Sequence, residues 1–127
     1  MAYVQDTTQS FAITLVALPE GQGVITIMIV HNTTSGVVYE YNVGTGAWSP
    51  SPPEAVEGDS ITSDVGIVNN GDASDTIFGQ FVSAQLTPSQ PLIQEAIAAV
   101  GQEIAVSWSF TMPPNSASIT INAGHVE

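Results

Sequence analysis

The chain has 127 residues with twelve Asp and Glu and no Lys or Arg, so its formal net charge is −12. Without cations it cannot neutralise the phosphates of nucleic acids or of anionic membranes. Without cysteine it has no disulfide, thiolate nucleophile or cysteine-type zinc site. We therefore expect no nucleic-acid partner.

Hydrophobic residues make up 43% of the chain and charged residues only 9%, which indicates a folded chain rather than a disordered one. The length fits a single domain, residues 1–127. The longest apolar run, VITIMIV, is far shorter than the roughly 18 residues of a membrane-spanning helix, so we expect no membrane insertion. The N-terminal stretch lacks the basic and apolar regions of a secretory signal.

The first 48 residues predict short antiparallel strands joined in a β-meander. Residues 1–10 are polar and predict either an arm or an edge strand. Apolar residues then recur in segments bounded by Gly, Pro and Asn, as in strands separated by turns. We expect strands at 11–17, 24–31 and 37–42 and a short one from Ala47, with turns at 20–23, 32–36 and 43–46.

The segment 49–58, SPSPPEAVEG, interrupts this pattern. Proline cannot donate a hydrogen bond to a sheet, so the segment predicts a stiff, extended surface connection. We expect it to cross between two sheets. The alternative is a linker between two sub-lobes, 1–48 and 59–127.

The second half predicts further strands at 60–69, 75–85, 103–112 and 116–123. A hairpin or tight turn is expected at 69–72, because its Asn and Gly residues tolerate positive φ. Residues 91–100 fit two structures. Their apolar residues fall at helical spacing, yet the same stretch can form a strand that ends in a turn at Gly101.

From Gly58 onward, the order of features resembles a known family. It runs from Gly-Asp through a strand into VNNG, then TIFGQFVSA, a turn at AVGQE, AVSWSFTMP and a last strand ITINAGHV. This order is similar to the immunoglobulin-like, cell-adhesion-related (CARDB-type) modules of bacterial and archaeal surface proteins and of virion proteins. The resemblance implies a strand at 91–100 and no catalytic residue, and the first half of the chain has no counterpart in it. We therefore expect an all-β protein, an immunoglobulin-like or jelly-roll-like antiparallel β-sandwich of about seven to nine strands.

Carboxylates gather around the Pro-rich segment and the following turn. Glu54, Glu57, Asp59, Asp72 and Asp75 are candidates for a Ca²⁺ site, since Ca²⁺ takes oxygen ligands. They lack the order of an EF-hand loop, and a solvated acidic rim is the favoured interpretation. No other cofactor is expected.

Three aromatic residues are candidates for ligand binding. Tyr39 and Tyr41 share one face of their expected strand, and Trp48 follows, so the three could form a platform that stacks on sugars. Packing in the core or in an interface is the favoured interpretation. His31 and His125 are the only imidazoles, and we expect them to lie too far apart for a metal site.

The chain carries no recognisable catalytic constellation. No serine lies in a Gly-x-Ser-x-Gly elbow, and a triad would need one of the two histidines. We expect no enzyme activity and no catalytic residue.

The expected function is structural. The chain starts at Met1 without an export signal and relies on Ser, Thr, Asn and Gln for its polar surface. We expect a virion subunit, such as a capsid decoration, spike or coat-associated protein, located in the virion, with copies of itself or a capsid shell as protein partners. The alternatives are a carbohydrate-binding or adhesion module on a cell surface, with a glycan as partner, and an extracellular filament subunit.

Overall fold

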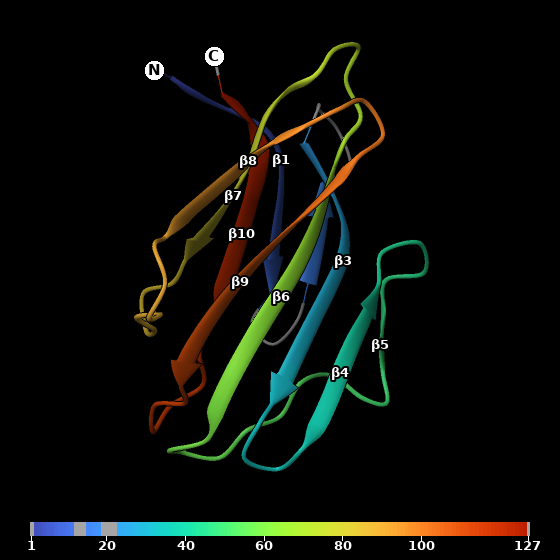
Figure 1. The fold of residues 1–127 in the computed structure, drawn as a ribbon. Coiled ribbons are helices and arrows are strands. Elements are labelled where there is room, and N and C mark those ends of the chain that lie inside the picture. Colours follow the sequence, from blue (N-terminus) through green and yellow to red (C-terminus); the bar gives the residue numbers. More distant parts are fainter. Residues whose placement is uncertain (1, 12–14, 19–22, 127) are drawn as a thin grey trace.

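The computed structural model describes residues 2–11, 15–18 and 23–126 (Figure 1), and these residues contain ten β-strands and no helix. The strands are β1 Tyr3–Phe11, β2 Leu15–Leu18, β3 Gly23–Asn32, β4 Val37–Asn42, β5 Ala47–Ser49, β6 Ser60–Asn69, β7 Asp75–Val82, β8 Ile93–Ala98, β9 Glu103–Thr111 and β10 Ile119–Val126.

The strands form two five-stranded antiparallel sheets that pack as a sandwich (Figure 1). Sheet A has the order β2-β1-β10-β7-β8, and sheet B has the order β5-β4-β3-β6-β9. The expected all-β antiparallel sandwich is confirmed. β6 and β9 lie in one sheet and β7, β8 and β10 in the other, which is consistent with strands B and E and strands C, C′ and F of an immunoglobulin-like sandwich.

Regular alternation in the sequence builds the core between the sheets. In β9, Ile104, Val106, Trp108 and Phe110 are buried, whereas the residues between them are half-buried or exposed. Successive strand residues point to opposite faces, so this strand turns one apolar face inward. The Trp108 ring lies 5.6 Å from the Phe81 ring, centroid to centroid, across the sandwich. Loss of such a buried Trp costs about 3–5 kcal/mol, so this contact is a main anchor between the sheets.

The N-terminal residues are neither an arm nor an edge strand. β1 lies inside sheet A, between β10 and β2. The expectation was wrong because the core-facing residues of β1 include Thr7 and Gln9, which are buried although they are polar. A strand with polar residues on both faces has no alternation that a sequence pattern could reveal.

A single strand over 11–17 was also the wrong expectation. Phe11 ends β1 and pairs with Leu15 of β2, so the chain reverses direction between them. Residues 12–14 and the expected turn residues 20–22 lie outside the described residues. β2 and β3 belong to different sheets, so the expected meander is limited to β3, β4 and β5.

The Pro-rich segment connects two strands of the same sheet rather than crossing between sheets. It leaves β5 and enters β6, and both belong to sheet B. The Asp59 carboxylate accepts hydrogen bonds from Asn32 Nδ2 at 2.8 Å and from the Val56 N–H at 3.0 Å. The Tyr39 hydroxyl donates to the Glu54 carbonyl at 3.3 Å. These bonds fasten the segment to β3 and β4, and both sheets draw strands from both halves of the chain.

Two further local expectations are resolved by the strand pairing. Residues 93–98 form a strand, β8, which pairs with β7 along its whole length. The turn at 69–72 is tight, with the Gly71 N–H donating to Asn69 Oδ1 at 3.0 Å. It leads from sheet B to sheet A, so it is not a hairpin.

Candidate functional site

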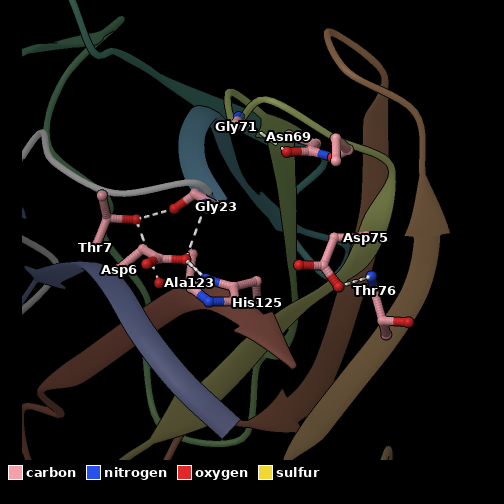
Figure 2. Close-up of polar contacts among 10 residues, drawn as sticks. Asp6, Thr7, Gly23, Asn69, Gly71, Asp75, Thr76, Ala123 and His125 are labelled. Carbon is pink, nitrogen blue, oxygen red and sulfur yellow. Dashed lines mark hydrogen bonds and ion pairs between the residues drawn. The ribbon is translucent and has the colours of Figure 1, made fainter. Parts of the chain in front are cut away.

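The first and last strands of the chain meet in sheet A, where β1 pairs with β10 (Figure 1). A β-bulge interrupts this ladder between Gln5 and Thr7, which leaves Asp6 without a paired residue on β10. The Asp6 carboxylate contacts Nδ1 of His125 (Figure 2) and accepts a hydrogen bond from the Gly23 N–H at 3.4 Å. We define the N-terminal seam as the five residues Asp6, Thr7, Gly23, Gly124 and His125.

The seam joins the two sheets as well as the two strands. The Thr7 hydroxyl of sheet A donates to the carbonyl of Gly23, where β3 of sheet B begins (Figure 2). At Gly124 there is no room for a side chain, because a Cβ there would lie 2.8 Å from the Asp6 nitrogen. Glycine is required at such a close backbone approach. The seam is therefore a close-fitting contact made of polar groups.

Uncharged side chains form hydrogen bonds across the outer face of sheet A. The hydroxyl oxygens of Ser10 and Thr120 lie 3.1 Å apart. The Thr8 hydroxyl donates to the side-chain carbonyl of Asn122, whose amide donates to Gln80 at 3.1 Å. These bonds run from β1 through β10 to β7 and satisfy polar groups without using charge.

Carboxylates are unequally distributed between the two outer faces. On sheet B, Glu40, Asp64 and Glu103 are all exposed. On the described strands of sheet A, Glu95 is the only exposed carboxylate, because Asp6 is turned into the seam. Sheet A therefore presents the less acidic of the two faces.

An aromatic contact covers the outer face of sheet A near the termini. The rings of Tyr3 and Phe78 meet edge to face, with centroids 5.4 Å apart and an angle of 74°. Desolvation and the neighbouring Glu95 carboxylate, which accepts its hydrogen bond, raise the pKa of the Tyr3 hydroxyl. This contact ties β1 to β7 and β8 on the side of the sheet away from the core.

β8 forms an edge of sheet A and carries exposed apolar residues. Ile97 on the strand is 75% exposed, and Leu92 and Val100 beside it are 53% and 54% exposed. β8 pairs with β7 on one side only. An apolar edge strand of this kind is a template for pairing with another chain.

β9, an edge of sheet B, is blocked by side chains. The Gln94 amide donates to the Ser107 carbonyl at 2.6 Å and accepts from the Ser107 N–H at 3.3 Å. Gln90 accepts from the Ser109 N–H at 2.6 Å, and the Ser89 N–H donates to the Ser109 carbonyl at 2.9 Å. These groups occupy the backbone positions that an added strand would need, so the two edges differ in accessibility.

The structure does not bring the five acidic candidates together. Glu54, Glu57 and Asp59 precede β6, whereas Asp72 and Asp75 follow it. A strand of ten residues spans about 33 Å. In the part of the chain that the structure describes, no group of three or more His, Cys, Asp or Glu could hold a metal ion. Asp59 is instead a structural residue, and hydrogen bonds from Asn32 and from the Val56 backbone lower its pKa.

The candidate aromatic platform is not formed. Tyr39 and Tyr41 are each only 6% exposed and belong to the core, because β4 turns them inward and turns Val38 and Glu40 outward. Burial raises the pKa of Tyr41. Trp48 is half-buried and packs on Tyr41 with ring centroids 5.1 Å apart. The three residues serve packing rather than an exposed stacking surface.

The two histidines lie toward opposite ends of the sandwich. His125 lies beside Gly23 at the start of β3, whereas His31 lies eight residues further along that strand. Eight residues of a strand span about 26 Å. The two imidazoles therefore cannot share a metal ion.

Sequence reasoning missed both the seam and the blocking glutamines. Asp6 is the only carboxylate before Glu20, but nothing in the polar stretch around it indicates a partner that lies 119 positions away in the chain. Gln94 and Gln90 likewise form hydrogen bonds with the backbone of β9, whose position beside them depends on the complete fold. These features arise from pairing between distant segments and carry no local pattern.

Comparison with known proteins gives no relative: no family model, curated protein or solved structure matches this chain. In the described residues, no helix has the length and hydropathy needed to cross a membrane.

Proposed function

We propose that this chain is a non-catalytic structural subunit that assembles with copies of itself, and that it serves in a virion as a coat or capsid-associated protein. The charge difference between the two outer faces is the observation that supports this most. In a chain of net charge −12, sheet A exposes a single carboxylate on its described strands, Glu95. Two copies that meet through sheet A experience the least repulsion.

The edges formed by β8 and β9 favour the same contact. β8 offers an open backbone edge flanked by the exposed apolar residues Leu92, Ile97 and Val100. The edge of β9 is occupied by Gln90 and Gln94. Strand addition gives affinity through main-chain hydrogen bonds and specificity through alternate side chains. Sheet A is therefore the side through which copies join.

The surface chemistry fits a particle that meets changing solvent. Hydroxyl and amide groups such as Ser10, Thr120 and Asn122 form the hydrogen bonds on the outer face of sheet A. These groups do not titrate over the ordinary pH range, so their bonds persist when the pH changes. This property supports a place in a virion over a place in a buffered cell interior.

Sedimentation velocity at a fixed protein concentration between pH 7 and pH 4 tests the proposal. The assembled fraction should rise as the pH falls, because carboxylates lose their charge near pH 4 and repulsion between copies declines. Sodium chloride at pH 7 should act in the same direction by screening. A monomer at every pH and salt concentration, or an assembly that weakens toward pH 4, would contradict the proposal.

A further inference from the structure

We infer that β1 is an exchangeable strand, which in the assembled protein pairs with β10 of a second copy of this chain. The inference rests on the proposed self-assembly and names the contact through which the copies join. It concerns the N-terminal seam and the ladder between β1 and β10.

Residues 3–10 of β1 contribute little to the apolar core. None of the buried apolar residues that form the core cluster lies within residues 2–10. Among residues 3–10, the two buried residues, Thr7 and Gln9, are polar, and Gln9 Oε1 is buried without a hydrogen-bond partner in the described part of the chain. Burial of apolar surface is the main source of stability. This part of β1 is therefore held chiefly by its backbone ladders with β10 and β2, by the polar seam and by the contact between Tyr3 and Phe78.

β10, in contrast, is a core strand that needs a neighbour. Ile119, Ile121 and Ala123 are almost completely buried, and β10 pairs with β7 on its other side. Without β1, β10 would become an edge of sheet A with unpaired N–H and C=O groups. The ladder runs from Tyr3 opposite Val126 to Phe11 opposite Ile119. A β1 strand from a second copy can make the same ladder, bond for bond.

The topology also places β1 and its paired strand β10 at opposite ends of the chain. In an immunoglobulin-like sandwich, strand F lies between strands C and G. β10 stands in the position of strand F, and the position of G is filled by β1, from the opposite end of the chain. The chain does not connect β1 directly to β10, so the pairing can form within one copy or between two.

Charge and shape identify the partner as another copy of this chain. β1 carries one carboxylate, Asp6, and β10 carries one imidazole, His125, and these two groups contact each other. In a chain without Lys or Arg, this contact gives the Asp6 carboxylate an imidazole partner. Gly124 additionally accepts only a strand whose backbone bulges at the matching position. A second copy satisfies both requirements.

Cysteine cross-linking tests the exchange, because the chain has no cysteine of its own. Thr8→Cys and Asn122→Cys, whose native side chains contact each other across β1 and β10, are prepared separately with different affinity tags. They are mixed, assembled under the conditions identified by sedimentation, and oxidised. We expect covalent heterodimers, because after exchange position 8 of one copy lies opposite position 122 of another copy. The pair Ser10→Cys and Thr120→Cys repeats the test where the first pair folds poorly.

The matched control uses two strands that both contribute to the core. Thr62 and Ser109 face each other across β6 and β9, with hydroxyl oxygens 3.2 Å apart. Thr62→Cys mixed with Ser109→Cys reports only random collisions between copies. Paired positions have millimolar effective concentrations, so the β1–β10 heterodimer should exceed this background on the order of a hundredfold.

The outcomes separate this inference from the proposed function. Assembly with abundant β1–β10 heterodimers supports the exchange. Assembly in which the β1–β10 pair gives no more heterodimer than the β6–β9 pair overturns the exchange and leaves the proposed function standing. Absence of assembly under every condition overturns both.

Discussion

Single polar side chains determine where the connections of this sandwich lie. Asn32 is 1% exposed, and its Oδ1 accepts hydrogen bonds from the N–H groups of Thr34 and Ser35 at 3.1 and 3.0 Å. Its Nδ2 donates to the Asp59 carboxylate. One buried amide thus fixes both the turn after β3 and the Pro-rich segment. Loss of either side chain would leave buried partners unsatisfied, which is costlier than the bond itself is favourable.

Asp59→Asn should destabilise the fold at neutral pH. Hydrogen bonds from Asn32 and from the Val56 backbone lower the pKa of Asp59 in the folded state. A carboxylate with a lowered folded pKa stabilises the protein above its unfolded pKa of about 3.9, and this contribution is lost as the pH falls through the folded pKa. The difference in melting temperature between Asp59→Asn and the original chain should therefore shrink below about pH 4.

Calorimetry from pH 7 to pH 3 measures this difference. The matched control is Asp72→Asn, since Asp72 is exposed in the turn before β7. It should leave the melting temperature close to that of the original chain throughout the range. An Asp59→Asn variant that melts with the original chain at pH 7, or a difference that widens in acid, would contradict the assigned role.

The sheet edges formed by β8 and β9 differ. β9 is covered by side-chain amides, whereas β8 is open and bordered by exposed apolar residues. Natural sheets usually protect their edges against unwanted pairing. Of these two edges, β8 is the one at which the proposed assembly could add a strand.

Gln94→Ala should open the protected edge. It removes the two hydrogen bonds between Gln94 and the Ser107 backbone, so the free energy of unfolding should fall by about 1–2 kcal/mol. Urea denaturation measures the change. Gln85→Ala is the control, because Gln85 accepts a bond from the Ser118 N–H outside any strand. Only Gln94→Ala should also increase thioflavin T-positive aggregation, and equal aggregation of the two variants would argue against edge protection.

Ile97→Thr should weaken assembly without unfolding the subunit. Ile97 is 75% exposed on the open edge of β8, and threonine keeps the β-branched shape while it adds a hydroxyl. Sedimentation at the pH of assembly should show a smaller assembled fraction. Val38→Thr, at a 47% exposed position on sheet B, is the matched control. Equal loss of assembly in both variants would show that the contact between copies is not specific to β8.

The sequence allowed the second half of the fold to be predicted much better than the first. β6 and β9 alternate regularly between buried and exposed residues, so their existence and type follow from the pattern. β1 buries Thr7 and Gln9 and therefore shows no apolar face. Its place in sheet A depends on pairing with β10, whose residues lie more than a hundred positions away. The N-terminal seam could not be predicted for the same reason.

The net charge of the molecule and its distribution over the two sheets affect how copies of the chain could meet. The formal net charge is −12, with no Lys or Arg to offset it. The exposed carboxylates Glu40, Asp64 and Glu103 lie on sheet B, whereas sheet A exposes Glu95 among uncharged side chains on its described strands. Repulsion between copies would therefore be stronger in a contact through sheet B than in one through sheet A.

A regular, repeating assembly distinguishes a structural subunit from a protein that only loses solubility. Near its isoelectric point, about 4.1 for this sequence, any protein tends to associate because its net charge vanishes. Specific contacts through β8 and the seam would produce closed or helical symmetry with a constant repeat, whereas loss of charge alone would produce amorphous precipitate. Acid-induced association by itself is therefore weaker support than a repeating structure.

Negative-stain electron microscopy of the unmodified chain, brought from pH 7 to about pH 4.5 where carboxylates begin to lose charge, is the most direct measurement. The account predicts shells or filaments of constant width with a regular subunit repeat, which dissolve when the pH returns to 7. Dispersed monomers together with irregular aggregates, and no repeating particle under any of these conditions, would contradict it.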